Sequence, residues 1–435
     1  MKYSYLSDSV DLLSSLEEFS SVSVPDNEVT NTVSGIIEEI RLRGDVALLE
    51  KTLLYDGVSL TKNEISIQPT ELTEAESKLS GSERSAILEA ISNVRLFHEK
   101  SIPNNWSTLN KHGAEVGEKH YPINRIGIYI PGGNVPLVST VIMTVTLAKV
   151  AQVPEITVVT PPDSKGKVSY QLLAALGMLG VTEVYRVGGA QAIASLAFGT
   201  ESIPAVDKIF GPGNAYVNEA KRQSFGTVGI DLLPGPSEVM VIADSTASPD
   251  FVAAALLAQA EHGSGKEKVY FLFTEEQLFP RVIEEIEVQL KTLSHQKSIQ
   301  RVLEIGLRSI FLPNLVRLSE VASFIAPEHL ELQVSEENLT FLTESITTAG
   351  AFLMGHKTAT SLGDFAAGPS HVLPTGRSSR FSSGLKLDDF FRRTSFIKYD
   401  DGSVRNAQAV IAEFAKMEQL DAHGRSLSMR IEDKG

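Results

Sequence analysis

Cysteine is absent from the 435-residue chain, and this absence restricts the chemistry that the protein can perform. Without a thiol there is no disulfide, no thiolate ligand for a metal and no cysteine nucleophile. Any metal site must therefore use histidine, carboxylate or amide oxygen as its donors. Only nine histidines are present, so a histidine beside another titratable residue is a candidate for chemistry.

Excess positive charge and long apolar runs are also missing. The chain has 39 Lys and Arg against 54 Asp and Glu, a formal net charge of −15. This balance argues against nucleic acid and against an anionic membrane surface as partners. No apolar run reaches the roughly 18 residues of a membrane-spanning helix. Residues 1–20 carry acidic side chains and no long apolar core, so we expect no secretory signal and a cytoplasmic location.

Helix and strand patterns alternate along most of the chain. Residues 26–101 have apolar side chains at helical spacing. From "RIGIYIPGG" onward, short apolar runs alternate with helical stretches, and Gly or Pro follows many of the runs. This pattern is typical of parallel sheets with crossover helices. It predicts an α/β fold with two Rossmann-like parallel-sheet units, a possible duplication, and small helical segments at the N- and C-termini.

The length and a hydrophobic content of 42% predict a large core shared among several domains. We expect an N-terminal tail, a discontinuous α/β domain, a Rossmann-like α/β domain and a helical C-terminal tail. Their boundaries in that order are 1–25, 26–127 with 238–385, 128–237, and 386–435. The tail includes "VRNAQAVIAEFAKMEQLDAHGRSLSMRI", which we expect to form a long helix.

Four loops, "IPGGNVP", "RVGGAQ", "FGPGN" and "PGPSE", are expected at the carboxyl ends of strands, where open α/β sheets bind ligands. Their glycines would let backbone N–H groups approach a phosphate or another anion. None of the loops has the spacing G-x-G-x-x-G. A nucleotide-like ligand and ordinary turn glycines therefore both remain open interpretations.

Gln259 and His262 lie three positions apart near the end of an expected helix, on one face of it. An amide oxygen and an imidazole nitrogen could bind a divalent ion, preferably zinc, if other donors converge on them. Asp364 and His423 are candidates for those donors. A histidine that merely ends a helix is the alternative interpretation.

Glu328 and His329 stand side by side in the apolar stretch "IAPEHLEL". Pro327 predicts a break there, so both side chains could face one cleft at a junction of helix and strand. Apolar surroundings would raise the pKa of Glu328 and lower that of His329, which would suit both groups for proton transfer near neutral pH. A polar pair at a buried turn, hydrogen-bonded to the backbone, is the alternative.

Several motifs taken together resemble one known family. They are "IYIPGG", "VGGAQAIASLAFGTESIPAVDKIFGPGNAYVNEAKRQ", "GPSEVMVIAD", "QAEHG", "APEHLE", "GDFAAGPSHVLPT" and a late "AHG". In this order they are similar to the histidinol dehydrogenase family over about residues 30–430. The resemblance implies a zinc-containing, NAD-dependent homodimer that oxidises L-histidinol through an aldehyde to L-histidine with two NAD, in the last steps of histidine biosynthesis.

The resemblance also implies roles for particular residues. The zinc ligands would be Gln259, His262, Asp364 and His423, with the tail exchanged between subunits so that His423 completes the partner's site. The acid–base pair would be Glu328 and His329. Contacts to substrate would come from the zinc ligands and His329 together with Ser237, His371 and Glu418. Contacts to NAD would come from Tyr129, Gln191 and Asn214.

The chemistry fits a chain without cysteine, because water rather than a thiol would have to add to the aldehyde. Three other functions remain alternatives: a sulfopropanediol dehydrogenase-like enzyme on the same scaffold, a catalytically idle binding protein, and a metallohydrolase that needs no NAD. Four positions depart from the family pattern. Leu147 replaces an expected proline, Pro234 an alanine, and Gln152 and Gln419 each replace a glycine.

Overall fold

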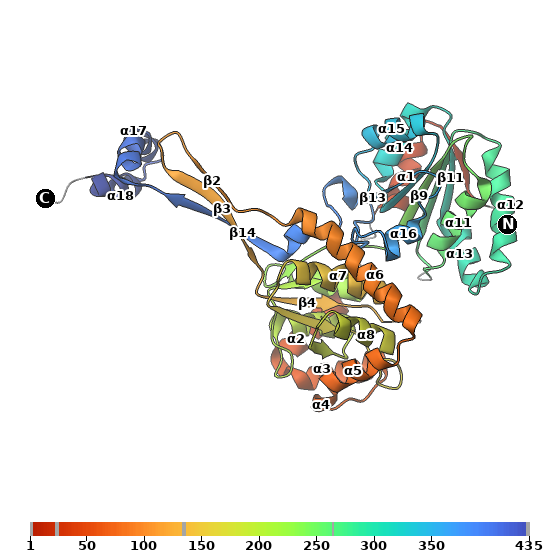
Figure 1. The fold of residues 1–435 in the computed structure, drawn as a ribbon, viewed down its shortest axis with the longest axis horizontal. Helices are drawn as coiled ribbons and strands as arrows, with labels where there is room; N and C mark the ends of the chain where they lie inside the picture. The colour runs from red at the N-terminus through yellow and green to blue at the C-terminus, as the bar shows by residue number, and fades with distance from the viewer. Residues whose placement is uncertain (1–2, 22–25, 133–135, 263–264, 432–435) are drawn as a thin grey trace.

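The computed structural model describes residues 3–21, 26–132, 136–262 and 265–431. Figure 1 shows two α/β units and a narrow arm that projects away from both of them. Each unit has a parallel sheet, which confirms the predicted fold class, although a duplication is not shown. Among the described residues, no helix is both long enough and apolar enough to cross a membrane.

The first unit is built on a five-stranded sheet in the order β6-β5-β4-β7-β8. These strands are Glu183–Tyr185, Glu155–Val159, Arg125–Tyr129, Lys208–Phe210 and Gly229–Ile230. Both faces are apolar and are covered by helices, as is usual for parallel sheets. One face packs against α2 (Asn27–Arg43), α3 (Asp45–Asp56), α9 (Gly189–Phe198) and α10 (Ala215–Ser224). The other packs against α5 (Pro69–Ser77), α6 (Gly81–His98), α7 (Val138–Val150) and α8 (Tyr170–Met178).

Most of residues 26–127 belongs to this first unit, which differs from the expected grouping of that segment with residues 238–385. Val33 and Leu48 share a core with Tyr129 of the five-stranded sheet. In chain order, the short helix α4 (Lys62–Ile65) follows α3, and the 3-10 helix η1 (Glu99–Ser101) follows α6. An amphipathic pattern predicts that one helix face is buried, but it does not say which sheet buries it.

The second unit is built on a six-stranded parallel sheet in the order β1-β11-β10-β9-β12-β13. These strands are Tyr5–Ser7, Leu307–Phe311, Lys268–Phe273, Glu238–Ala243, His329–Gln333 and Ala351–Met354. One face packs against α11 (Pro249–Ala260), α12 (Leu278–Leu290) and α13 (Gln296–Gly306). The other packs against α1 (Leu12–Ser20), α14 (Leu315–Ile325) and α15 (Glu336–Ser345). The segment expected as an N-terminal tail therefore supplies an edge strand and a packed helix.

The arm is an antiparallel ribbon that ends in two helices (Figure 1). Its strands are β14 (Phe391–Lys398), β3 (Glu115–Pro122) and β2 (Trp106–Leu109), and its helices are α17 (Asp401–Met417) and α18 (Asp421–Ile431). The 386–435 segment thus begins with η3 (Leu387–Phe390) and a strand, which apolar alternation did not mark because most of its side chains are exposed. The expected long helix is broken at Gln419, whose φ is 55°.

Candidate active site

The candidate site lies at the amino edge of the six-stranded sheet, where β9 and β12 begin next to each other. Val239 of β9 is in register with His329 of β12, so the residues just before them are also neighbours. The loop "PGPSE" at residues 234–238 leads into β9, which corrects its expected position at the carboxyl end of a strand. The other three glycine loops do follow β4, β6 and β7.

Glu328 is held in a fixed position at the start of β12. The predicted break at Pro327 is confirmed, because α14 ends at Ile325 and the strand begins two residues after the proline. Oε2 of Glu328 accepts hydrogen bonds from the Ser237 hydroxyl and from the Glu238 backbone N–H, both at 2.7 Å. Burial raises the pKa of Glu328, as expected from its apolar surroundings.

The His329 ring lies between a backbone carbonyl and a carboxylate. Its Nδ1–H donates to the carbonyl of Glu238 at 3.3 Å, which assigns Nε2 as the nitrogen that can accept a proton. Nε2 lies 3.4 Å from Oδ1 of Asp364. Burial by itself lowers the pKa of His329, but the negative charges of Glu328 and Asp364 outweigh burial and raise it to about 9. The expected lowering is therefore wrong, because two carboxylates face the ring.

Asp364 is carried by the short helix α16 (Thr360–Phe365). Burial raises its pKa, but the hydrogen bond and charge of His329 and the charges of His371 and His262 hold the pKa below its usual value. Nδ1–H of His371 donates to the Asp364 carbonyl at 2.8 Å, and burial lowers the pKa of this histidine. The structure thus brings the predicted residues Asp364, His371 and His329 together.

Gln259 and His262 stand at the end of α11 and carry donors that suit a metal. Gln259 is buried, and neither its amide oxygen nor its amide nitrogen has a hydrogen-bond partner. An unpaired buried amide costs about 1–3 kcal/mol, which coordination of its oxygen would offset. His262 is exposed and interacts electrostatically with Asp364 and Glu328. Amide, imidazole and carboxylate together form a donor set that fits zinc.

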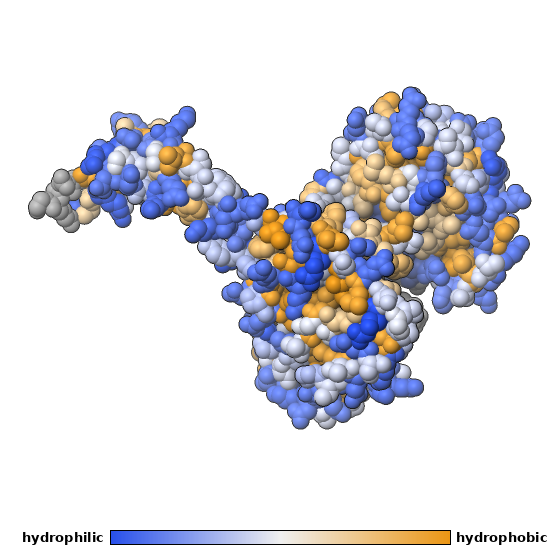
Figure 2. Space-filling model, in the orientation of Figure 1, coloured by the Kyte–Doolittle hydropathy of each residue, from blue (hydrophilic) through white to orange (hydrophobic). Residues whose placement is uncertain are grey.

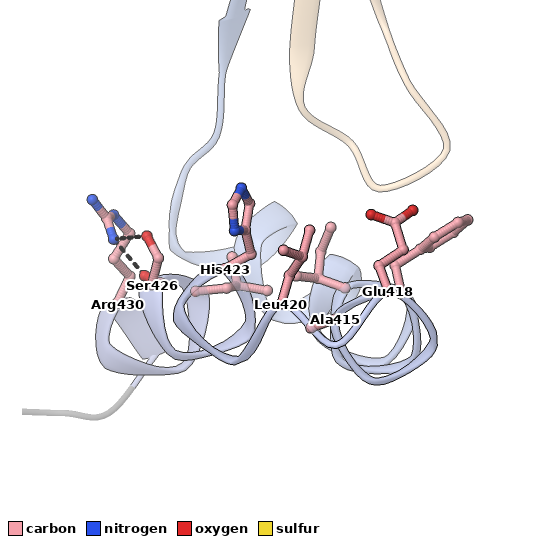
Figure 3. Close-up of a pocket in the computed structure, with 9 residues that line it drawn as sticks. Ala415, Glu418, Leu420, His423, Ser426 and Arg430 are labelled. Carbon is pink, nitrogen blue, oxygen red and sulfur yellow. Dashed lines mark hydrogen bonds between the residues drawn. The ribbon is translucent and has the colours of Figure 1, made fainter.

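Glu418 and His423, the remaining predicted residues of this site, lie on the arm and not beside the others. In the part of the chain that the structure describes, no three His, Asp or Glu residues are grouped so that they could hold a metal ion. Figure 1 shows the arm helices α17 and α18 far from both sheets. In Figure 3 the side chains of Glu418 and His423 point away from the same side of these helices. One chain therefore assembles only part of the predicted site.

The predicted NAD contacts lie at the carboxyl edge of the five-stranded sheet. Tyr129 ends β4, and its hydroxyl accepts a hydrogen bond from the N–H of Gly189 at 3.3 Å. Gln191 is buried in α9, and its Nε2 donates to Asp56 at 3.4 Å. Asn214 is exposed and caps α10 through its side-chain oxygen. Tyr129 is the last residue of β4, Gln191 comes after β6 and Asn214 comes after β7. All three thus belong to the carboxyl edge, where a parallel sheet commonly binds its ligand.

Three acidic residues near these two edges were not found from the sequence. Glu238 opens β9 and is fully buried, and Glu331 lies in β12. Asp56 ends α3 beside Gln191, and burial raises its pKa to about 6. A carboxylate within an otherwise apolar strand was the available signal for Glu238 and Glu331, since such groups are rarely buried without a partner.

A family model, curated relatives and a solved structure all match almost the whole chain and point to the same family. A family model described as histidinol dehydrogenase matches residues 21–431. A histidinol dehydrogenase of Geobacillus kaustophilus is 40% identical over 405 residues, which covers 93% of this chain and 94% of that protein. Another from Nitrosomonas europaea is 41% identical over 408 residues and covers 94% of each. The crystal structure of histidinol dehydrogenase from Elizabethkingia anophelis has a TM-score of 0.93 at 36% identity and covers 99% of this chain and 98% of that one. The chain belongs to the histidinol dehydrogenase family.

Proposed function

We propose that this chain oxidises L-histidinol through L-histidinaldehyde to L-histidine, with NAD as the oxidant and zinc bound at the substrate site. The observation that carries the proposal is the buried Glu328–His329 pair, whose imidazole faces Asp364 of α16. Helix α16 contacts α11, which carries the unpaired buried amide of Gln259. As a step of histidine biosynthesis that draws on the NAD pool, the reaction is assigned to the cytoplasm. The family relationship does not favour a sulfopropanediol substrate.

We assign zinc and NAD to two different sets of residues. Zinc would be held by Gln259, His262 and Asp364 together with His423 of a partner subunit. When bound, zinc orients the substrate through its nitrogen atoms and NAD accepts one hydride in each of the two oxidations. NAD would be held by Tyr129, Gln191 and Asn214 at the carboxyl edge of the five-stranded sheet.

His329 performs the first proton transfer. Its Nε2 accepts the proton of the alcohol as the carbon loses a hydride, and the alcohol becomes an aldehyde. The Nδ1–H bond to the Glu238 carbonyl keeps the ring oriented during this transfer. The charges of Glu328 and Asp364, which raise the pKa of His329, stabilise the imidazolium that results.

Water supplies the second oxygen, because the chain has no thiol to add to the aldehyde. His329 first releases the alcohol proton to solvent. Glu328 orients the water, and His329 accepts the proton that the water loses as its oxygen adds to the aldehyde carbon and returns that proton to the aldehyde oxygen. The resulting gem-diol loses a second hydride and a proton to give the carboxylic acid. In total, one alcohol, one water and two NAD⁺ become one acid, two NADH and two protons. Ser237 and Glu238 hold the Glu328 carboxylate in one orientation throughout.

The enzyme would act as a homodimer in which the arms are exchanged. The arm exposes Val410, Phe414, Met417 and Leu420, an apolar set that the rest of its own chain does not cover. Figure 2 shows a hydrophobic surface over the first unit, where α6 exposes Leu88, Leu96 and Phe97. Exposed apolar patches of this kind commonly mark protein–protein interfaces. Exchange would carry Glu418 and His423 into the site of the other subunit.

The test is formation of NADH from NAD⁺ and L-histidinol by the purified chain, followed by its absorbance. We expect activity with L-histidinol and none with dihydroxypropane sulfonate, about one zinc per chain, and loss of activity on chelation that added zinc restores. His329→Asn should lower kcat by about 100- to 10,000-fold. His295→Asn is the matched control, because His295 is exposed at the start of α13, belongs to neither proposed set of site residues and should leave kcat unchanged when replaced. Turnover of the sulfonate alone, or an equally active His329→Asn variant, would overturn the proposal.

A further inference from the structure

The helix that carries Asp364 is short and lacks a cap of its own. Helix α16 has six residues, and its N-cap residue is Ala359, which has no side-chain acceptor. A helix of this length is not stable by itself. The amide of Thr360 and its hydroxyl instead donate to Oε2 of Glu331, at 3.1 and 3.0 Å. The Glu331 carboxylate of strand β12 therefore supplies the N-terminal hydrogen-bond acceptor that the side chain of Ala359 lacks.

Glu331 is itself firmly held. It is buried, and its Oε1 accepts a hydrogen bond of 2.6 Å from Nε2 of Gln333. Residues two apart in a strand share a face, so Glu331 projects from the same face of β12 as His329. Burial raises the pKa of Glu331, and the bonds from Gln333 and Thr360 oppose that effect. Both carboxylate oxygens are thus occupied within the protein.

We propose that Glu331 is a positioning residue, which fixes α16 so that Asp364 meets His329 and the donors on α11. Thr360 and Asp364 lie one helical turn apart, so anchoring the first places the second. Helix α16 also packs against α11, which carries Gln259. The inference rests on the proposed function, in which Asp364 is a zinc ligand. Partners of metal ligands usually contribute to affinity through such orientation.

Zinc affinity measured with a competing chelator tests the proposal without reference to activity. Glu331→Met removes both acceptors at similar volume and should weaken zinc binding by about 10- to 100-fold. Glu331→Gln keeps one acceptor for Thr360 and should recover most of the affinity. Glu337→Gln is the control, because Glu337 is exposed in the next helix and should bind zinc like the parent.

A double variant shows whether Glu331 acts through Asp364. If it does, Glu331→Met should weaken zinc binding no further once Asp364→Asn is present. If Glu331→Met lowers zinc affinity equally in the parent and in the Asp364→Asn variant, the proposal is overturned. It is also overturned if the Glu331→Met variant melts at a lower temperature yet binds zinc like the parent. Should Glu331→Met not fold, Thr360→Val removes one of the two bonds and should weaken zinc binding in the same direction.

The outcomes separate this inference from the proposed function. If the parent binds no zinc, or if Asp364→Asn binds it unchanged, the zinc site itself is wrong. If Asp364→Asn loses zinc while Glu331→Met and Thr360→Val keep the parental affinity, the site stands and only the positioning role of Glu331 is wrong.

Discussion

Two inactive variants of this enzyme should restore each other's activity when they are combined in one dimer. His262→Asn removes a proposed zinc ligand from the body of the subunit, and His423→Asn removes one from the arm. Because the arm helices lie far from both sheets of their own chain, His423 does not reach the donors beside His262 within one chain (Figure 1). Each complete site would then take its body from one subunit and its arm from the other.

The expected recovery follows from counting sites in such a dimer. When equal amounts of the two variants exchange subunits freely, about half of the dimers contain one chain of each kind. In each mixed dimer one site carries both lesions and the other carries neither. About a quarter of all sites are therefore intact, and the mixture should show about a quarter of the parental activity.

The assay is NADH formation from L-histidinol after coexpression of the two chains with different affinity tags, so that mixed dimers can be purified. The mixed dimers alone should reach about half of the parental activity. The control combines His262→Asn with Asp364→Asn, since both lesions lie on the body and every mixed site would carry one of them. That combination should remain inactive.

Purified mixed dimers of the His262→Asn and His423→Asn chains that stay inactive would refute the exchange of arms. The same result would place each site within one subunit and leave the position of the arm without a catalytic reason. Recovery in the control combination would also contradict the reasoning, because it would mean that the body donors are not both required.

Two further predictions concern stability. Burial lowers the pKa of His98 from 6.5 to about 4, so the unfolded chain binds its proton first, and stability should fall as the pH decreases from about 6.5 to about 4. The loss should reach about 2–3 kcal/mol in urea unfolding, and His98→Leu should abolish this pH dependence. Gln152 stands at a position where we expect the family to have glycine, and its φ is 58°. Gln152→Gly should stay within about 1 kcal/mol of the parent, whereas Gln152→Val should lose about 1–2 kcal/mol, since a β-branched residue is strained there.

Helices and strands with a strong local sequence signal could be predicted, whereas the elements that they pack against in the fold could not. "KVYFLF" is a short apolar run between polar residues, and it forms β10, one of the two central strands of its sheet. The break at Pro327 is likewise a local steric effect and could be predicted. The packing of residues 26–98 against one sheet rather than the other depends on which apolar surfaces meet in space. No pattern within those helices contains that information.

Glu331 shows why a residue of the site could be missed. The stretch "HLELQ" at residues 329–333 alternates polar and apolar side chains, which is typical of a strand with one face in solvent. The structure buries all five residues, because α14 and α15 pack on the face of Leu330 and Leu332 and α16 contacts Glu331 on the other face. In this strand the apolar side chains face the hydrophobic core, and the polar side chains face the buried active site instead of solvent. The two kinds of strand have the same sequence pattern and differ only in what covers the polar face.

The pKa of His329 depends on the same kind of tertiary information. Burial in an apolar stretch predicts a lowered pKa, and burial does act in that direction here. The opposite result arises because Asp364 approaches Nε2 from a helix that is distant in the sequence, and because Ser237 and Glu238 hold Glu328 close to the ring. A base flanked by two carboxylates binds its proton more tightly than an isolated one. The sequence could therefore identify His329 as a proton acceptor, but the strength of that base is a property of the assembled site.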